Sequence, residues 1–163
     1  MVPIKALLHA HNDVLRIGRC LETLYPCDEI VIVDHGSEDG TLRVAREYGA
    51  RIVDAAQASD LQVGELQIAG AVREDWILCL DPTESLTESL AASLFEWKSE
   101  AVAESASAYS VFLREETSEG WVENPVAQTR LVPANWKQWE GRFPKNEASA
   151  QALEGELLRF VLP

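Results

Sequence analysis

The residue types that could do chemistry in this chain stand at the ends of three apolar runs, which cover residues 4–10, 29–34 and 75–81. The residues of interest at and just beyond these ends are His9, His11 and Asn12; Asp34, His35, Gly36 and Ser37; and Asp81, Thr83 and Glu84. A carboxylate in such a place can accept hydrogen bonds from a base or a ribose, and carboxylate oxygens also suit hard divalent cations.

The three runs are predicted to be buried strands, because they are short, apolar and separated by segments with helical spacing. Residues 51–53 are predicted to add another strand. Strands that alternate with helices form a parallel sheet with right-handed crossovers, and open α/β sheets bind ligands beyond the carboxyl ends of their strands. The sequence therefore predicts an α/β fold in which the polar residues meet at one edge.

Helices are predicted where apolar residues recur every three or four positions. The first carries Val14, Ile17, Leu21 and Leu24, with Asn12 or Asp13 as its cap and Pro26 at its end. The second spans residues 41–48, with Ser37 or Asp39 as its cap and Gly49 at its close. Two more are expected, one within residues 55–74 and one carrying Leu86, Leu90, Leu94 and Phe95 after Thr83 or Thr87.

The pattern changes after residue 100. Residues 108–114 and 127–132 are predicted strands that pair as an antiparallel hairpin at the sheet edge, with a polar turn at 115–120. Leu153, Leu157 and Phe160 or Val161 stand at helical spacing, so residues 150–162 are predicted to form a terminal helix.

Composition excludes some classes of partner. The formal net charge of −13 argues against non-specific nucleic-acid binding and against an anionic membrane surface. The sequence contains neither a signal-peptide pattern nor a long apolar segment, so we expect a cytoplasmic location and no integral membrane segment. Cys20, Cys27 and Cys79 are widely spaced and are expected to be free thiols. The composition is compatible with oligomerisation.

Taken alone, residues 33–41 are typical of a well-made strand-to-helix turn, and Gly36 permits backbone angles closed to other residues. Likewise, His9, His11 and His35 are either loop residues that hydrogen-bond to backbone or solvent, or part of a metal site with Asp34.

The order and spacing of five segments resemble the nucleotide-binding half of family 2 glycosyltransferases. The segments are residues 6–12, 18–24, 28–41, 45–53 and 75–81. The resemblance implies a GT-A fold: an α/β sandwich with a mainly parallel central sheet, flanked by helices, that binds a nucleotide-diphosphate sugar with Mg²⁺ or Mn²⁺. It implies one domain over residues 1–163, with a nucleotide-binding half (1–98) and a minimal acceptor-side half (99–163). The acceptor is not implied.

By this resemblance, Asn12, Asp34, His35, Gly36 and Ser37 would line the nucleotide site. Asp81, with Glu84, would hold the metal, because a cation there neutralises the diphosphate leaving group. More weakly, residues 129–132 and 139–143 resemble the acceptor-side segment of lipopolysaccharide core transferases.

Three positions depart from the family pattern. Thr83 replaces the second aspartate of the metal motif, and Glu65 stands where the family often carries a basic residue. The family's catalytic base would fall near residues 143–145, where the sequence reads Phe, Pro, Lys, so the catalytic residue is unknown. Two hypotheses follow: a glycosyltransferase that uses other groups, or a non-catalytic GT-A domain that binds a nucleotide or a partner.

Overall fold

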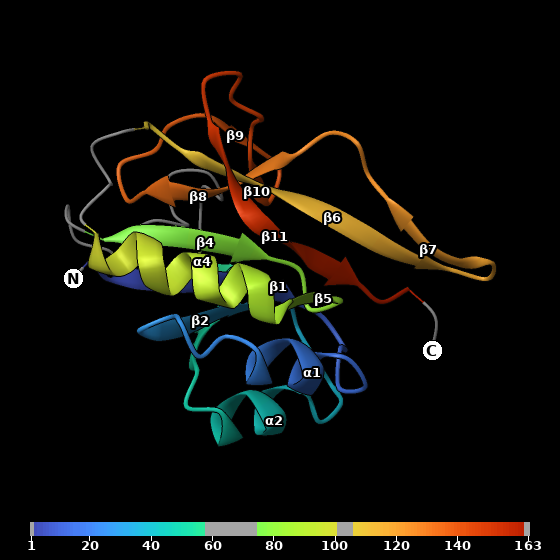
Figure 1. Cartoon of the computed structure of the whole chain (residues 1–163). Coiled ribbons are helices and arrows are strands. Elements are labelled where there is room, and N and C mark those ends of the chain that lie inside the picture. Colours follow the sequence, from blue (N-terminus) through green and yellow to red (C-terminus); the bar gives the residue numbers. More distant parts are fainter. Residues whose placement is uncertain (1, 58–74, 101–105, 162–163) are drawn as a thin grey trace.

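The computed structural model describes residues 2–57, 75–100 and 106–161 of the chain (Figure 1). Most of the helix expected within residues 55–74 lies outside this part, and only the 3₁₀ turn η1 (Ala55–Gln57) is described. Glu65 also lies outside the described residues.

Four parallel strands form one half of the main sheet, as the sequence predicted. They are β1 (Ile4–Ala10), β2 (Glu29–Asp34), β3 (Arg51–Asp54) and β4 (Trp76–Leu80), in the order β3-β2-β1-β4. The central strand β1 pairs with β2 through Ala10 and Asp34 and with β4 through Leu8 and Leu80. Because β1 neighbours both strands, the residues that follow β1, β2 and β4 meet at one edge.

The sheet continues beyond β4 in the order β8-β6-β11-β5. These strands are β5 (Glu84–Leu86), β6 (Tyr109–Thr117), β8 (Gln128–Pro133) and β11 (Gln151–Arg159), and β7 (Gly120–Glu123) pairs with β6 alone. The antiparallel pairing of β6 with β8 is confirmed. This pair lies inside the sheet instead of at its edge, because β8 also pairs with β4 and β6 also pairs with β11.

The predicted terminal helix over residues 150–162 is wrong, because β11 occupies this segment. Its pairing with β6 shifts register between Ala152 and Glu156, and Gly155 has a φ of 95°. A Cβ atom on Gly155 would lie 2.3 Å from the backbone nitrogen of Leu90. Glycine is therefore required where helix and strand approach, and the bulge breaks the alternation that would have indicated a strand.

Three α-helices of the described residues cover one face of the sheet. They are α1 (Ile17–Glu22), α2 (Thr41–Glu47) and α4 (Glu88–Ser99). Their apolar side chains pack with Ile4, Leu8 and Leu78 in the larger core cluster. On the opposite face Leu7 and Ile77 pack under the segment that holds β9 (Trp139–Glu140) and β10 (Phe143–Pro144). None of the described helices is long and apolar enough to cross a bilayer.

The predicted helix ends are partly correct. Thr87 caps α4, since its hydroxyl accepts the N–H of Leu90 at 3.2 Å, and Gly49 follows α2 with a φ of 76°. Neither Asn12 nor Asp13 caps α1, whose N-cap is Arg16. The N-cap of α2 is Gly40, while Asp39 accepts the N–H of Thr41 at 2.9 Å. Leu86 belongs to β5. Cys20, Cys27 and Cys79 are thiols that form no disulfide within the described residues.

Candidate functional site

The carboxyl ends of β1, β2 and β4 bring most of the predicted site residues to one edge of the sheet. Asp34 closes β2 and is 8% exposed, and Asp81 directly follows β4. Burial raises the pKa of Asp13, and the negative charge of Asp81 raises it further. Because β1 pairs with both β2 and β4, the loop after β1 lies beside the turn after β4.

Asn12 and Ser37 hold the loops after β1 and β2 together. The backbone N–H of Asn12 donates to the Ser37 hydroxyl at 3.0 Å, and the Asn12 side-chain oxygen accepts the N–H of Glu38 at 2.8 Å. Asn12 has a φ of 51°, a left-handed conformation that asparagine tolerates better than most residues. Asn12 therefore shapes the loop, and its amide oxygen is already engaged.

The loop after β2 folds back on Asp34. Both carboxylate oxygens of Asp34 accept the N–H of Ser37 at 3.3 Å. Gly36, which directly precedes Ser37, has a φ of 80°. The backbone N–H of His35 donates to the carbonyl of Ala10 at 2.9 Å. These bonds continue the β1–β2 pairing past the end of the sheet and fix the position of the Asp34 carboxylate.

The three histidines lie together. Nδ1 of His9 is 2.8 Å from Nε2 of His35, and the two rings stack with centroids 5.1 Å apart. Nδ1 of His11 lies 2.7 Å from the His35 carbonyl, which can only accept, so this nitrogen carries a proton. Burial lowers the pKa of His35, and the nearby Arg142 lowers it further.

No group of three or more His, Cys, Asp or Glu side chains within the described ranges is arranged to hold a metal ion. The histidine metal site considered from the sequence is therefore not formed by these side chains.

The turn after β4 is built around Asp81. Its Oδ1 accepts both the N–H and the hydroxyl of Thr83, at 3.0 and 2.6 Å. Its backbone N–H donates to Oε1 of Glu84 at 2.8 Å. Thr83 therefore orients the Asp81 carboxylate, and Glu84 fixes the backbone that carries it.

Glu84 is neutralised from within the protein. It is fully buried, and Arg130 of β8 donates to its two oxygens at 2.7 and 2.9 Å. Arg130 is also buried, bonds the Cys79 carbonyl at 3.2 Å and lies 4.0 Å from the Phe143 ring centroid. Arg159 of β11 reaches the same carboxylate at 3.3 Å. Both oxygens thus serve an internal ion pair, and the expected role of Glu84 as a metal ligand does not fit this arrangement.

A divalent cation fits this turn only as a partner of Asp81. The hydroxyl of Thr83 donates its hydrogen bond to Asp81, so the Asp81 carboxylate is the acidic ligand that this turn offers. Mg²⁺ is often bound by one or two carboxylates together with substrate phosphates and water, so such a site is chemically reasonable when the substrate completes it.

Sequence reasoning did not identify Arg130 and Arg159 as the partners of Glu84. The available signal was Glu84 itself, because a carboxylate followed closely by a buried apolar segment needs a cationic partner. The partner could not be identified, since Arg130 is 46 residues away along the chain.

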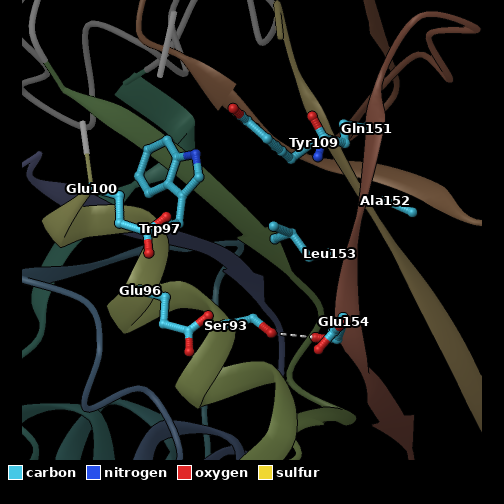
Figure 2. Close-up of a pocket in the computed structure, with 9 residues that line it drawn as sticks. All are labelled: Ser93, Glu96, Trp97, Glu100, Tyr109, Gln151, Ala152, Leu153 and Glu154. Atoms are coloured by element: carbon cyan, nitrogen blue, oxygen red, sulfur yellow. Dashed lines mark hydrogen bonds between the residues drawn. The ribbon is translucent and has the colours of Figure 1, made fainter. Parts of the chain in front are cut away.

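A separate cavity of about 270 Å³ lies between α4 and β11 (Figure 2). Its walls include Trp97 and Tyr109, which pack against Trp76, the first residue of β4. The site residue Asp81 follows the last residue of β4, so the cavity and the site lie at opposite ends of this strand. Glu96, Glu100 and Glu154 line this cavity and would repel an anionic ligand. It is therefore a poor place for a phosphorylated substrate.

Comparisons with known proteins agree with this architecture. Glycosyl transferase family 2 matches residues 6–114. A TPR repeat-containing protein of Synechococcus elongatus is 32% identical over 123 residues, which are 75% of this chain and 30% of that protein. Lipopolysaccharide core biosynthesis glycosyltransferase LpsC of Rhizobium meliloti is 43% identical over 47 residues, which are 29% of this chain and 17% of that protein.

The chain thus spans less than a third of the length of these two relatives. Among solved structures, Staphylococcus aureus TarS is similar to 98% of this chain over 37% of its own length, with a TM-score of 0.59 and 12% identity. At this low identity the similarity to TarS shows a shared fold. The match to the family model covers most of the chain. The chain therefore belongs to glycosyl transferase family 2 and has its GT-A fold.

Proposed function

We propose that this domain binds a nucleotide-diphosphate sugar at the carboxyl ends of β1, β2 and β4 and transfers the sugar to an acceptor still to be identified. The observation that carries the proposal is the strand order, which sets Asp34 and Asp81 on either side of β1 in a chain of family 2. These are the ends at which open α/β sheets bind ligands.

In this proposal Asp34 accepts hydrogen bonds from the base or the ribose, because it is the carboxylate that the loop after β2 holds in place. Asn12, His35, Gly36 and Ser37 form the wall around it. Residues 1–98 supply the nucleotide-binding half and residues 99–163 the acceptor side, within one domain.

Asp81 is the proposed ligand of Mg²⁺ or Mn²⁺, and Glu84 has a positioning role instead. A bound cation would supply positive charge to the diphosphate as the glycosidic bond breaks. The protein's own contribution is to hold Asp81 in one orientation through Thr83 and Glu84.

A second candidate is a binding module without turnover. Pro144 lies in β10 near the place where the family pattern puts its catalytic base, and proline offers no proton-accepting side chain. Thr83 in place of a second aspartate favours the same candidate.

Thermal unfolding against a panel of nucleotide-diphosphate sugars, with Mn²⁺ or with EDTA, tests donor binding. A donor at a hundred times its Kd should raise the melting temperature by about 5 °C or more. Asp81→Asn should remove the Mn²⁺-dependent part of this rise. Glu119→Gln, at the exposed β6–β7 turn, is the control and should behave as the wild type. If no donor raises the melting temperature, donor binding is excluded.

Release of nucleoside diphosphate separates the two candidates. We expect a bound donor to be hydrolysed slowly by the wild-type domain and not by Asp81→Asn, because water is a weak nucleophile that can take the place of the missing acceptor. Firm binding with no release under any metal condition would favour the binding module.

A further inference from the structure

The geometry points to Arg159, at the end of β11, as a residue that contacts the diphosphate of the bound donor. This inference rests on the proposed function, because it takes the edge formed by β1, β2 and β4 as the donor site. It adds a cationic contact from the acceptor-side half of the chain.

Arg159 lies directly beside the turn that carries Asp81. In the pairing of β11 with β5, Arg159 stands opposite Glu84, and the next residue donates its N–H to the Thr83 carbonyl at 2.8 Å. Nη2 of Arg159 is 3.3 Å from Oε2 of Glu84, whose other oxygen accepts the N–H of Asp81. One carboxylate therefore separates the guanidinium from the Asp81 backbone.

Glu84 does not need the charge of Arg159. Arg130 already gives this carboxylate two short hydrogen bonds, in the fork geometry that matches both oxygens. The side chain of Arg130 is 1% exposed, whereas that of Arg159 is 31% exposed. A buried arginine thus neutralises Glu84, and a second, partly exposed arginine is held beside it.

The surroundings need such a cation if a diphosphate is to bind. Asp34 at the end of β2, Asp81 after β4 and Asp13 in the loop after β1 place three carboxylates at this edge. Carboxylates repel a diphosphate, and a planar guanidinium with five N–H donors matches phosphate oxygens. Glu84 then orients Arg159, and Arg130 keeps Glu84 in place.

The test uses inorganic pyrophosphate as the probe, because it isolates the diphosphate from base and sugar. Its affinity is measured by calorimetry for the whole domain, first with EDTA and then with Mg²⁺. Arg159→Gln should weaken binding about tenfold or more in both conditions, as expected when a charged hydrogen bond is lost. Arg159→Lys keeps the positive charge without the planar guanidinium, so its pyrophosphate affinity should lie between those of the wild type and Arg159→Gln.

Arg51→Gln is the matched control. Arg51 is 42% exposed, makes an ion pair with Glu29 at 3.0 Å and lies at the opposite end of a strand, the first residue of β3. Its replacement should leave pyrophosphate affinity unchanged. Equal affinities for the Arg159→Gln and Arg51→Gln variants would overturn the inference, as would a wild-type domain that binds no pyrophosphate in either condition.

The donor panel separates this failure from that of the proposed function. If nucleotide sugars stabilise the wild type and Arg159→Gln equally, the donor site stands and Arg159 does not contribute to it. If they stabilise neither protein while pyrophosphate still distinguishes the two, Arg159 binds phosphate and the proposed function is wrong.

Discussion

Replacing Arg130 with Met should destabilise the domain by about 3 kcal/mol. The change removes both short bonds to Glu84 and the bond to the Cys79 carbonyl, and it leaves a carboxylate with no exposed surface. Stripping one partner from a buried ion pair costs about 3–5 kcal/mol. We expect the lower end of this range because Arg159 remains 3.3 Å from Glu84.

Urea unfolding at pH 7, followed by tryptophan fluorescence, measures this loss. For a domain of this size about 3 kcal/mol corresponds to a midpoint shift of roughly 1–2 M. The double variant Arg130→Met with Glu84→Gln should recover at least half of the loss, because the amide keeps an acceptor for the Asp81 N–H and carries no charge. A loss below about 1 kcal/mol, or a double variant no more stable than the single one, would refute the reasoning.

Two further predictions concern single residues of the strand ends and of β11. Burial lowers the pKa of His35 in the folded state below its ordinary value of 6.5. As pH falls below 6.5, the unfolded chain therefore takes up the proton first, and the folded state should lose stability. His35→Gln should flatten the melting temperature between pH 7.5 and 5, and parallel profiles for the two proteins would contradict this. Gly155→Ala should destabilise more than Gly36→Ala, since both have positive φ but only the former meets backbone, at Leu90. Left-handed strain costs about 1–2 kcal/mol in each variant and overpacking adds about 1–3 kcal/mol in the first, and equal urea midpoints would count against the steric argument.

The parallel half of the fold could be predicted because its residues carry the information locally. The buried runs that became β1, β2 and β4 are continuous and apolar, and Thr87 marks the start of α4. β11 could not be predicted from its local sequence. The spacing of Leu153 and Leu157 is also that of a helix, and the bulge at Gly155 is explained only by a helix that approaches from a distant part of the chain.

The site residues follow the same division. Asp34 and Asp81 could be placed at one edge because strands that alternate with helices run parallel, so their carboxyl ends lie at the same edge of the sheet. The role of Glu84 could not be predicted, because it depends on Arg130 and Arg159, which reach it from strands β8 and β11. A motif shows which groups are present at a turn, whereas the groups that neutralise them come from long-range pairing.

The path of the sheet has a consequence for how the domain forms. Only residues 81–83 separate β4 from β5 along the chain, yet β8, β6 and β11 lie between these two strands in the sheet. The sheet must therefore curl back on itself, and β5 cannot pair before residues 151–159 have been synthesised. Contacts that close such long loops form slowly. The strand that follows the Asp81 turn thus waits for β11, and a nascent chain that ends before β11 would carry the parallel strands with β5 unpaired.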